Sequence, residues 1–202
     1  ARAAALIAEQ NNALFSLRAE VKRMLDAERL QAACRPDENA GDAKAFLHWG
    51  TEALRAKAAL ADLAKIYPGY QGQGYEIAGF VWWQGNKDSY NPVHAAHYEA
   101  NLARLIPQLR KDYGASDAKF VLATGCGFTG RDGTGLQISE AQLAMADAKK
   151  YPQFADNVKA VDSRDLWREA NVSPKNQGYH YNRNAETYME VGLRLGWAMA
   201  DL

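Results

Sequence analysis

The sequence predicts an α/β fold in which helices cover both faces of a mostly parallel sheet. Three short apolar segments, each typical of a buried strand, are separated by longer stretches with the composition and spacing of helices. Because neighbouring parallel strands need a crossover connection, strands that alternate with helices indicate βαβ units. Three strands are few for a doubly wound domain, so we expect part of the sheet to lie outside this chain.

The composition limits the classes of function. The chain has 202 residues, 48% of them hydrophobic, which suits one domain with a packed core. Lys+Arg and Asp+Glu both number 24, so no overall basic field indicates nucleic-acid binding. No apolar run approaches the roughly 20 residues of a membrane span. Cys34 and Cys126 form neither a zinc pattern nor a disulfide framework, and we expect two free thiols rather than one bridge.

The first third of the chain carries helix signals and no strand signal. Helix-forming residues dominate up to Pro36, and apolar residues recur at roughly helical spacing. A second helical stretch runs from Asp42 to Ile66 and ends at the glycine-rich YPGYQGQG. We therefore expect a helical segment over residues 1–66 and an α/β part over residues 67–202. The chain opens without methionine or a secretory signal, and we interpret it as a trimmed or separately encoded piece.

The α/β part is expected to contain three strands and three helices. The expected strands are Tyr75–Trp83, Lys119–Ala123 and Asn157–Asp162. The expected helices are Pro92–Gly114, Leu136–Lys150 and Asn184–Leu202. Pro107 lies inside the first of these helices, where a proline removes a hydrogen bond, so we expect a kink or a break. Asn184 is a suitable cap for the last helix, and Glu186 in its first turn favours the helix dipole.

The first expected strand ends in WWQGNKD, residues Trp82–Asp88. Open parallel sheets bind ligands beyond the carboxyl ends of their strands, so this loop is a candidate rim of a site. Gln84 carries an amide that donates two hydrogen bonds, and Gly85 lets the backbone turn sharply near a ligand. An amide donor next to a backbone N–H can stabilise a developing oxyanion. The alternative interpretation is a surface turn with stacked aromatic side chains.

The second candidate motif is QGYHYNRNAETYMEVG, residues 177–192. His180 lies in its polar, glycine-containing start, directly before the last expected helix. A histidine held there by rigid structure and still reachable suits a general base. The alternative is a solvent-exposed histidine beside tyrosines.

Together, these two motifs and the upstream YPGYQGQGYEIAGFVWWQG resemble the SGNH/GDSL hydrolase superfamily. Within it, the match is to the sialic-acid-specific acetylesterase (SASA) branch of carbohydrate esterases, in particular to bacterial proteins. The resemblance runs from about Tyr67 to Leu202. It implies a flavodoxin-like three-layer α/β/α sandwich and serine-based hydrolysis of esters, typically acetyl groups on sugars, without a cofactor. It also implies Gln84, with Gly85 beside it, as the oxyanion-hole amide and His180 as the general base.

The sequence departs from this family at two places. The family's nucleophile stands in a Gly-Gln-Ser-Asn block after the first strand, and this chain has no such block. The family often has an aspartate three residues before the histidine, where this chain has Gln177. A glutamine carbonyl can accept from an imidazole N–H, but it does not stabilise an imidazolium as a carboxylate does. Asp88 is an alternative acid.

Three interpretations follow. In the first, the chain supplies the base and the oxyanion-hole amide of an acetylesterase whose serine lies on an N-terminal segment or a second chain. In the second, its pocket binds an acetylated carbohydrate or another small ester without cleaving it. In the third, the chain is a scaffold whose helical first third docks to a partner. The expected substrate-binding residues are Trp82, Trp83, Asp88, Tyr179 and Gln177, with Tyr90 as a further stacking surface. The resemblance also implies a periplasmic or extracellular location.

Two other features carry weaker signals. His94 and His97 would share a helix face, but without a clear third ligand we expect solvated histidines and no metal site. The loop TGCGFTGRDGTG lacks the Gly-Lys-Ser/Thr of a P-loop. The resemblance implies that it borders the pocket, with Thr124, Gly125 and Cys126 in its lining. Cys126 is an alternative nucleophile, although no neighbouring residue in the sequence lowers its pKa.

Overall fold

The structure is a computed structural model of the 202-residue chain, and it describes residues 56–202. The first expected helix, most of the second and Cys34 lie outside the described residues. The chain divides into two compact units at Gly74 and Tyr75. Each unit is described by itself.

The described part of the first unit is helical and ends in a glycine-rich turn. Residues 56–61 are helical, and helix α4 follows at Leu63–Ile66. The expected end at Ile66 is confirmed: Tyr67 is extended, with φ −118° and ψ 101°, as suits a residue before proline. Gly72 adopts φ +81°, a conformation that favours glycine.

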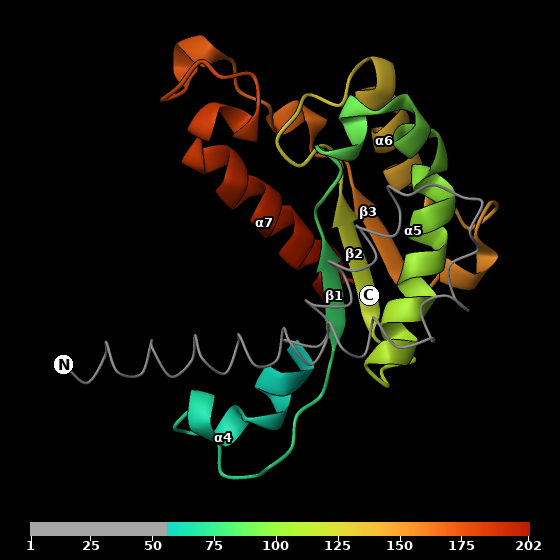
Figure 1. Cartoon of the computed structure of the whole chain (residues 1–202), viewed down its shortest axis with the longest axis vertical. Coiled ribbons are helices and arrows are strands. Elements are labelled where there is room, and N and C mark those ends of the chain that lie inside the picture. Colours follow the sequence, from blue (N-terminus) through green and yellow to red (C-terminus); the bar gives the residue numbers. More distant parts are fainter. Residues whose placement is uncertain (1–55) are drawn as a thin grey trace, which may run out of the picture. The chain divides into compact units, whose positions relative to one another are not determined.

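The second unit contains a parallel sheet of three strands, in the order in which they follow along the chain (Figure 1). The strands are β1 (Gly79–Trp82), β2 (Lys119–Ala123) and β3 (Val158–Val161). In register, Val81 of β1 stands beside Val121, and Val121 stands beside Lys159 of β3. The predicted parallel α/β arrangement is confirmed, and β2 has the predicted bounds. β1 is shorter than predicted, because residues 75–78 do not join the ladder as strand.

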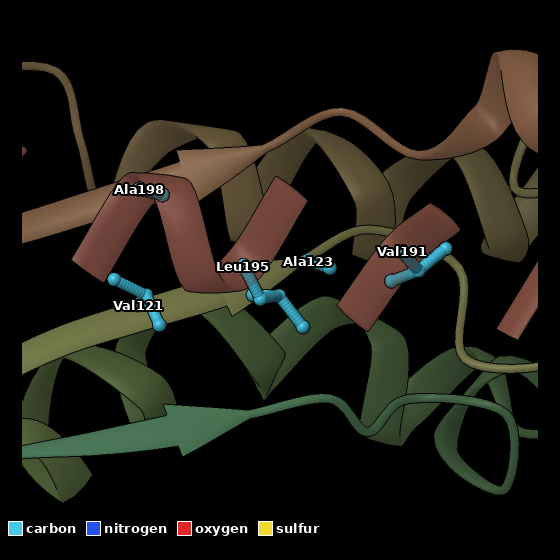
Figure 2. Close-up of a cluster of buried hydrophobic side chains, with 5 residues drawn as sticks. All are labelled: Val121, Ala123, Val191, Leu195 and Ala198. Atoms are coloured by element: carbon cyan, nitrogen blue, oxygen red, sulfur yellow. The ribbon is translucent and has the colours of Figure 1, made fainter. Parts of the chain in front are cut away.

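Helices cover both faces of this sheet (Figure 1). Helices α5 (Pro92–Asp112) and α6 (Gly133–Ala144) lie on one face, and α7 (Ala185–Ala200) lies on the other. The side chains of β2 alternate between these faces, since successive residues of a strand point in opposite directions. Val121 and Ala123 pack against Val191, Leu195 and Ala198 of α7 (Figure 2).

Two expectations for the helices of one face are corrected. α5 is not broken at Pro107, which lies inside one continuous helix with buried Leu102, Ile106 and Leu109 on both sides of it. This buried stripe holds the helix against the core across the missing hydrogen bond. The helix expected at residues 136–150 is α6, which begins and ends earlier. After α6 the chain turns instead, because the Asp147 side chain accepts a hydrogen bond from the Lys149 N–H at 2.8 Å.

The predicted cap of the last helix is confirmed. The Asn184 side chain accepts a hydrogen bond from the Thr187 N–H at 3.2 Å, and Asn184 itself is buried. Its amide group also donates to the carbonyl of Val172 at 3.3 Å. The start of α7 is thereby fixed to the loop that precedes it, which matters for the position of His180.

One buried charge ties the amino ends of two strands together. Arg110 of α5 is only 8% exposed. Its Nε donates to the carbonyl of Ala118, just before β2, at 2.9 Å. Its Nη2 donates to the side-chain oxygen of Asn157, just before β3, at 2.7 Å.

Within residues 56–202, no helix is long and apolar enough to cross a membrane.

Candidate active site

The loops that follow β1 and β2 are joined at the carboxyl edge of the sheet. The Cys126 thiol, in the loop after β2, donates to the carbonyl of Trp83 at 2.9 Å. The Thr124 hydroxyl donates to the Asp162 carboxylate, in the loop after β3, at 3.1 Å. The Ser163 N–H donates back to the same hydroxyl at 2.9 Å. These contacts fix the edge at which the sequence places its candidate residues.

Gln84 is held at both ends of its side chain. Its Nε2 donates to Oδ2 of Asp88 at 2.5 Å, and the Tyr98 hydroxyl lies 3.1 Å from its Oε1. Because an ionised carboxylate only accepts, the contact with Asp88 fixes which end of the amide is the donor. One N–H of the amide is thereby engaged, and the second is left to bind another acceptor.

The backbone of Gln84 is fixed by two buried polar side chains. Its carbonyl oxygen lies 3.0 Å from the Tyr98 hydroxyl and accepts from Nε2 of Gln142 at 2.5 Å. The same hydroxyl accepts from the Trp82 indole N–H at 3.3 Å. Burial raises the pKa of Tyr98 far above its ordinary value, so the hydroxyl stays protonated and keeps its role as a donor. The loop after β1 is therefore rigid where it carries the amide.

Sequence reasoning missed Tyr98 and Gln142, although each stands on an apolar face of its helix. Tyr98 shares the buried side of α5 with Ala95 and Leu102, and Gln142 shares that of α6 with Ile138. A polar residue at a buried helical spacing signals a buried hydrogen-bond network, because an unpaired buried amide would be costly. That signal is present in the sequence.

Gly85 adopts a backbone conformation that requires glycine. Its φ is +142°, and it is buried. A Cβ placed on Gly85 would lie 2.9 Å from Cγ2 of Ile138 and 3.3 Å from Nε2 of Gln142. The Ser89 N–H donates to the Gly85 carbonyl at 3.0 Å and closes the loop. The sharp turn expected at this glycine is thus present.

His180 opens a turn in which four successive residues have positive φ. His180, Tyr181, Asn182 and Arg183 have φ of 48°, 48°, 50° and 60°. A left-handed conformation costs about 1–2 kcal/mol per non-glycine residue, so the surroundings must hold this turn in place. His180 is exposed, and its ring has no hydrogen-bond partner within the described part of the chain.

Asn182 is the residue that holds the turn. It is 2% exposed, and its side-chain oxygen accepts from the N–H groups of Gln177 at 3.1 Å and Gly178 at 2.9 Å. Its amide nitrogen donates to the carbonyl of Arg168 at 3.1 Å. The Gln177 side chain donates to the carbonyl of Tyr179 at 2.9 Å instead of pairing with His180. The position of His180 thus depends on Asn182.

An aromatic cluster joins the two candidate motifs. The ring centroid of Trp83 lies 5.6 Å from that of Tyr181 and 5.5 Å from that of Tyr188. A Cβ on Gly127, in the loop after β2, would lie 3.1 Å from the His180 backbone nitrogen. The neighbours of Gln84 and His180 are therefore in contact, and the structure places both residues at the same edge of the sheet.

The aromatic residues predicted to bind substrate have different surroundings. The Trp83 ring lies in the aromatic cluster, and the Trp82 indole bonds inward to Tyr98. Tyr179 is 44% exposed, and its ring meets that of His180 edge to face, with centroids 5.0 Å apart. Tyr90 is 67% exposed. Exposed aromatic surface near the candidate base is thus provided by Tyr179.

The glycine-rich loop after β2 differs from expectation. Thr124 is fully buried and Gly125 is buried, so neither lines an accessible surface. Thr124 is held in this buried position by its hydrogen bonds with Asp162 and Ser163, which follow β3. Cys126 is a free thiol, and burial raises its pKa to about 11. The thiol is therefore protonated at neutral pH, which removes the thiolate that a cysteine nucleophile needs.

No serine within residues 56–202 stands free beside His180. Ser163 is 1% exposed and donates to the Thr124 carbonyl at 2.5 Å, and Ser139 is fully buried. Ser89 donates to the carbonyl of Asn86 at 2.7 Å, and Ser173 donates to that of Arg168 at 3.3 Å. The described residues thus bring together the candidate amide and base without a nucleophile.

Two hollows lie at the opposite end of the sheet from these residues. One, of about 580 Å³, is lined near the amino ends of β1 and β2 by residues that include Tyr75, Ile77, Tyr113 and Lys119. It touches neither Gln84 nor His180.

Comparison with known proteins shows which fold and which family this chain is similar to. No curated protein matches the chain. Its fold is similar to that of a protein from Arabidopsis thaliana known from an X-ray structure, with a TM-score of 0.51 and 22% sequence identity. The match covers 76% of this chain and 52% of the plant protein, so the chain spans about half of that protein's length.

A family model matches a similar share of the chain, and the match begins within the expected helical segment. The model describes carbohydrate esterases of the sialic acid-specific acetylesterase type, and it matches residues 49–201. This range includes Gln84, Gly85 and His180, together with all three strands of the sheet. The chain belongs to the sialic acid-specific acetylesterase family of carbohydrate esterases.

Proposed function

We propose that this chain supplies the oxyanion-hole amide, Gln84, and the general base, His180, of a carbohydrate O-acetyl esterase. The nucleophilic serine would come from another segment, either N-terminal or on a second chain. The observation that carries the proposal is the contact between the two motifs through Trp83 and Tyr181. It brings a rigid amide and an exposed histidine to one edge of the sheet in a member of a carbohydrate esterase family.

The proposed reaction is a double displacement. His180 accepts the proton of the serine hydroxyl as its oxygen attacks the acetyl carbonyl. The oxyanion that forms is stabilised by the free N–H of Gln84 and by the Gly85 backbone N–H. His180 then gives the proton to the departing sugar oxygen, which leaves an acetyl-serine. Water, deprotonated by His180, releases acetate and restores the serine.

Asp88 is proposed to act through Gln84. Its carboxylate accepts from the Gln84 amide at 2.5 Å and therefore sets the direction of the remaining N–H. Gln177 was expected to accept from the base, but its side chain donates to the carbonyl of Tyr179. Tyr179, exposed beside His180, is proposed as the surface on which a sugar ring stacks, since sugar rings present apolar faces to aromatic side chains.

The test uses the protein purified from its source, with p-nitrophenyl acetate and an O-acetylated sugar as substrates. Loss of a general base costs about 10²–10⁴-fold in rate, and loss of an oxyanion donor costs about 10²–10³-fold. We expect such losses in kcat for His180→Ala and Gln84→Ala. His97→Ala is the matched control, since His97 is exposed on α5 and its ring bonds its own helix at Val93. Full activity in His180→Ala would contradict the proposal.

The second candidate function is a non-catalytic subunit that binds acetylated sugars or acts as a scaffold. The observation that favours it is that no serine of residues 56–202 is a free hydroxyl: Ser139 is fully buried, and Ser89, Ser116, Ser163 and Ser173 each donate to another group. Calorimetric titration with an O-acetylated sugar separates these functions. A native mass equal to that of this chain, with binding and no turnover, supports the sugar-binding subunit. A scaffold shows neither binding nor turnover.

A further inference from the structure

The guanidinium of Arg110 is a buried charge whose hydrogen-bond partners are all neutral. Its Nε donates to the carbonyl of Ala118, and its Nη2 donates to the carbonyl and to the side-chain oxygen of Asn157, at 3.1 Å and 2.7 Å. Within residues 56–202, the N–H groups of Nη1 have no acceptor. Arginine is almost never fully buried unless it is paired, because a charge is costly to remove from water.

The acid that acts on Arg110 does not pair with it. Burial lowers the pKa of Arg110, and the charge of Asp117 opposes this shift without an ion pair in the described part of the chain. Asp117 is exposed, and it lines the other hollow, beside Lys119. A guanidinium stays protonated in spite of such a shift. Among residues 56–202, the positive charge of Arg110 is therefore left without a counter-charge.

Structural roles account for only part of this side chain. α5 ends at Asp112, and cations in its last turn are favourable because the carboxyl end of a helix carries partial negative charge. Lys111, exposed in the same turn, supplies such a cation without leaving water. The link between Ala118 and Asn157 uses Nε and Nη2. Nη1 is left without a structural role.

Arg110 lines a hollow of about 600 Å³ at the carboxyl end of α5, beside the amino ends of β2 and β3 (Figure 1). Since Nε and Nη2 turn toward the segments before these strands, Nη1 is the part of the guanidinium that remains for the hollow. The volume is in the range of sites for small organic molecules. The other lining residues include Pro107, Lys111, Ser116, Gln153 and Phe154.

The lining offers further donors and an apolar wall. Lys111 and Gln153 are exposed, and their side chains have no hydrogen-bond partner among residues 56–202. The ammonium group of Lys111 adds a second positive charge next to that of Arg110. Phe154, which is 3% exposed, and Pro107 contribute apolar surface. This combination suits a small molecule that carries an anionic group on a polar body.

We propose that this hollow, named the Arg110 hollow, binds a small organic anion through a carboxylate or phosphate group. The anionic oxygens accept from Nη1 of Arg110 and from Nζ of Lys111, since hydrogen bonds between charged groups are the stronger ones. The amide of Gln153 binds the polar body of the ligand. The anion thereby supplies the counter-charge that the described residues lack.

The Arg110 hollow is separate from the candidate active site. It lies at the amino ends of the strands, whereas Gln84 and His180 lie beyond the carboxyl ends. The inference therefore does not rest on the proposed function. Because Arg110 joins the end of α5 to the segments before β2 and β3, a bound anion is expected to stabilise the folded protein.

The experiment is a titration of the full 202-residue chain, labelled with nitrogen-15 and followed by NMR. The probes are glucuronate and glucose 6-phosphate, with neutral glucose as the control, all at one ionic strength set with sodium chloride. We expect the amides of residues 110–118 and 153–157 to shift and to saturate with at least one of the two anions and not with glucose. Any segment of the chain that competes for the hollow is present in this test.

The two anions distinguish the source of the charge. Saturation with glucuronate alone assigns a carboxylate, and saturation with glucose 6-phosphate alone assigns a phosphate. Shifts that saturate only at residues 177–184 would place the anion at the candidate active site and would overturn the inference. Absence of saturation with both anions would mean that water alone solvates Nη1, and would also overturn it.

Two variants test the residues that carry the inference. Lys111→Gln removes an exposed charge, so we expect a loss of affinity of about three- to five-fold, the range of an exposed charge pair. Lys87→Gln, at an exposed lysine beyond the carboxyl end of β1, is the matched control and keeps the affinity.

Arg110→Gln is expected to abolish binding. Because Arg110 also joins two segments of the fold, circular dichroism has to show that this variant is folded; if it is not, Lys111→Gln decides the test. Wild-type affinity in every folded variant would contradict the assignment of the site.

Ester turnover is measured on the same samples, and it separates the two proposals. A saturable anion site in a protein without turnover leaves this inference standing and rejects the proposed function. Turnover in a protein that binds neither anion does the reverse.

Discussion

At the scale of single residues, the candidate amide depends on groups that touch no substrate. Gln84 is fixed by Tyr98, Gln142 and Asp88, which come from three different segments. Sequence reasoning found Gln84, Gly85 and Asp88 because they follow one another in a loop at a strand end. It missed Tyr98 and Gln142 because a network of this kind is formed only when α5 and α6 pack against each other.

Tyr98→Phe is expected to lower both stability and activity. The change removes the acceptor of the Trp82 indole N–H and a hydroxyl that Gln142 also contacts at 3.2 Å. Each buried hydrogen bond that is lost costs about 0.5–1.5 kcal/mol, so we expect a loss of about 1–3 kcal/mol in the free energy of unfolding in urea. Tyr75→Phe, at an exposed tyrosine at the other end of the sheet, should change neither. Equal stability of Tyr98→Phe and the wild type would show that the network contributes nothing.

Two glycine substitutions are expected to have opposite signs. Gly85→Ala places a methyl group 2.9 Å from Ile138 at φ +142°, so we expect a loss of about 1–3 kcal/mol. Gly192→Ala lies in α7 with open space around it, so we expect a gain of about 0.5–1 kcal/mol. Urea unfolding of the 202-residue chain measures both changes. A gain for Gly85→Ala would contradict the geometry of the loop.

At the scale of elements, the turn that carries His180 is held against its own backbone preference. Asn182→Ala removes the acceptor of two N–H groups and one donor in a buried position. We expect about 2–3 kcal/mol of lost stability and a larger loss of kcat than of binding, because the base is displaced. Arg183→Ala, at an exposed neighbour in the same turn, is the control. A loss of stability with unchanged kcat would show that the turn does not position the base.

The end of β3 makes the protein sensitive to acid. Hydrogen bonds from Arg164 lower the pKa of Asp162 from 3.8 to about 2. A depressed pKa in the folded state contributes stability above about pH 4, and this stability is lost as the pH falls toward 2. We expect the melting temperature of Asp162→Asn to fall less than that of the wild type over this range. Parallel decreases in the two proteins would exclude Asp162 as a source of the dependence.

The elements that the sequence predicted well are those whose signals are local. The run KFVLA gives β2 its predicted bounds because all of its central residues are buried. Asn184 was recognised because a cap depends on one side chain and the next turn. α6 was misplaced because Gly133 and Gly135 suggest a loop, whereas packing against α5 extends the helix through them.

At the scale of the whole molecule, the sequence predicted three strands in a parallel sheet, and residues 56–202 form such a sheet. The placement of Gln84 at the carboxyl edge followed from the rule that ligands bind beyond the carboxyl ends of parallel strands, whereas His180 was assigned to the same site by the family resemblance. The contacts between them did not follow, because Trp83 and Tyr181 are separated by most of the unit in sequence.

The order of the strands in the sheet also affects how the chain folds. β1, β2 and β3 lie beside one another in the order of their synthesis, so each strand has to find only its immediate predecessor. Closing a short loop costs less entropy than closing a long one, and contacts between successive elements form fastest. The three strands can therefore pair one after another as the chain leaves the ribosome.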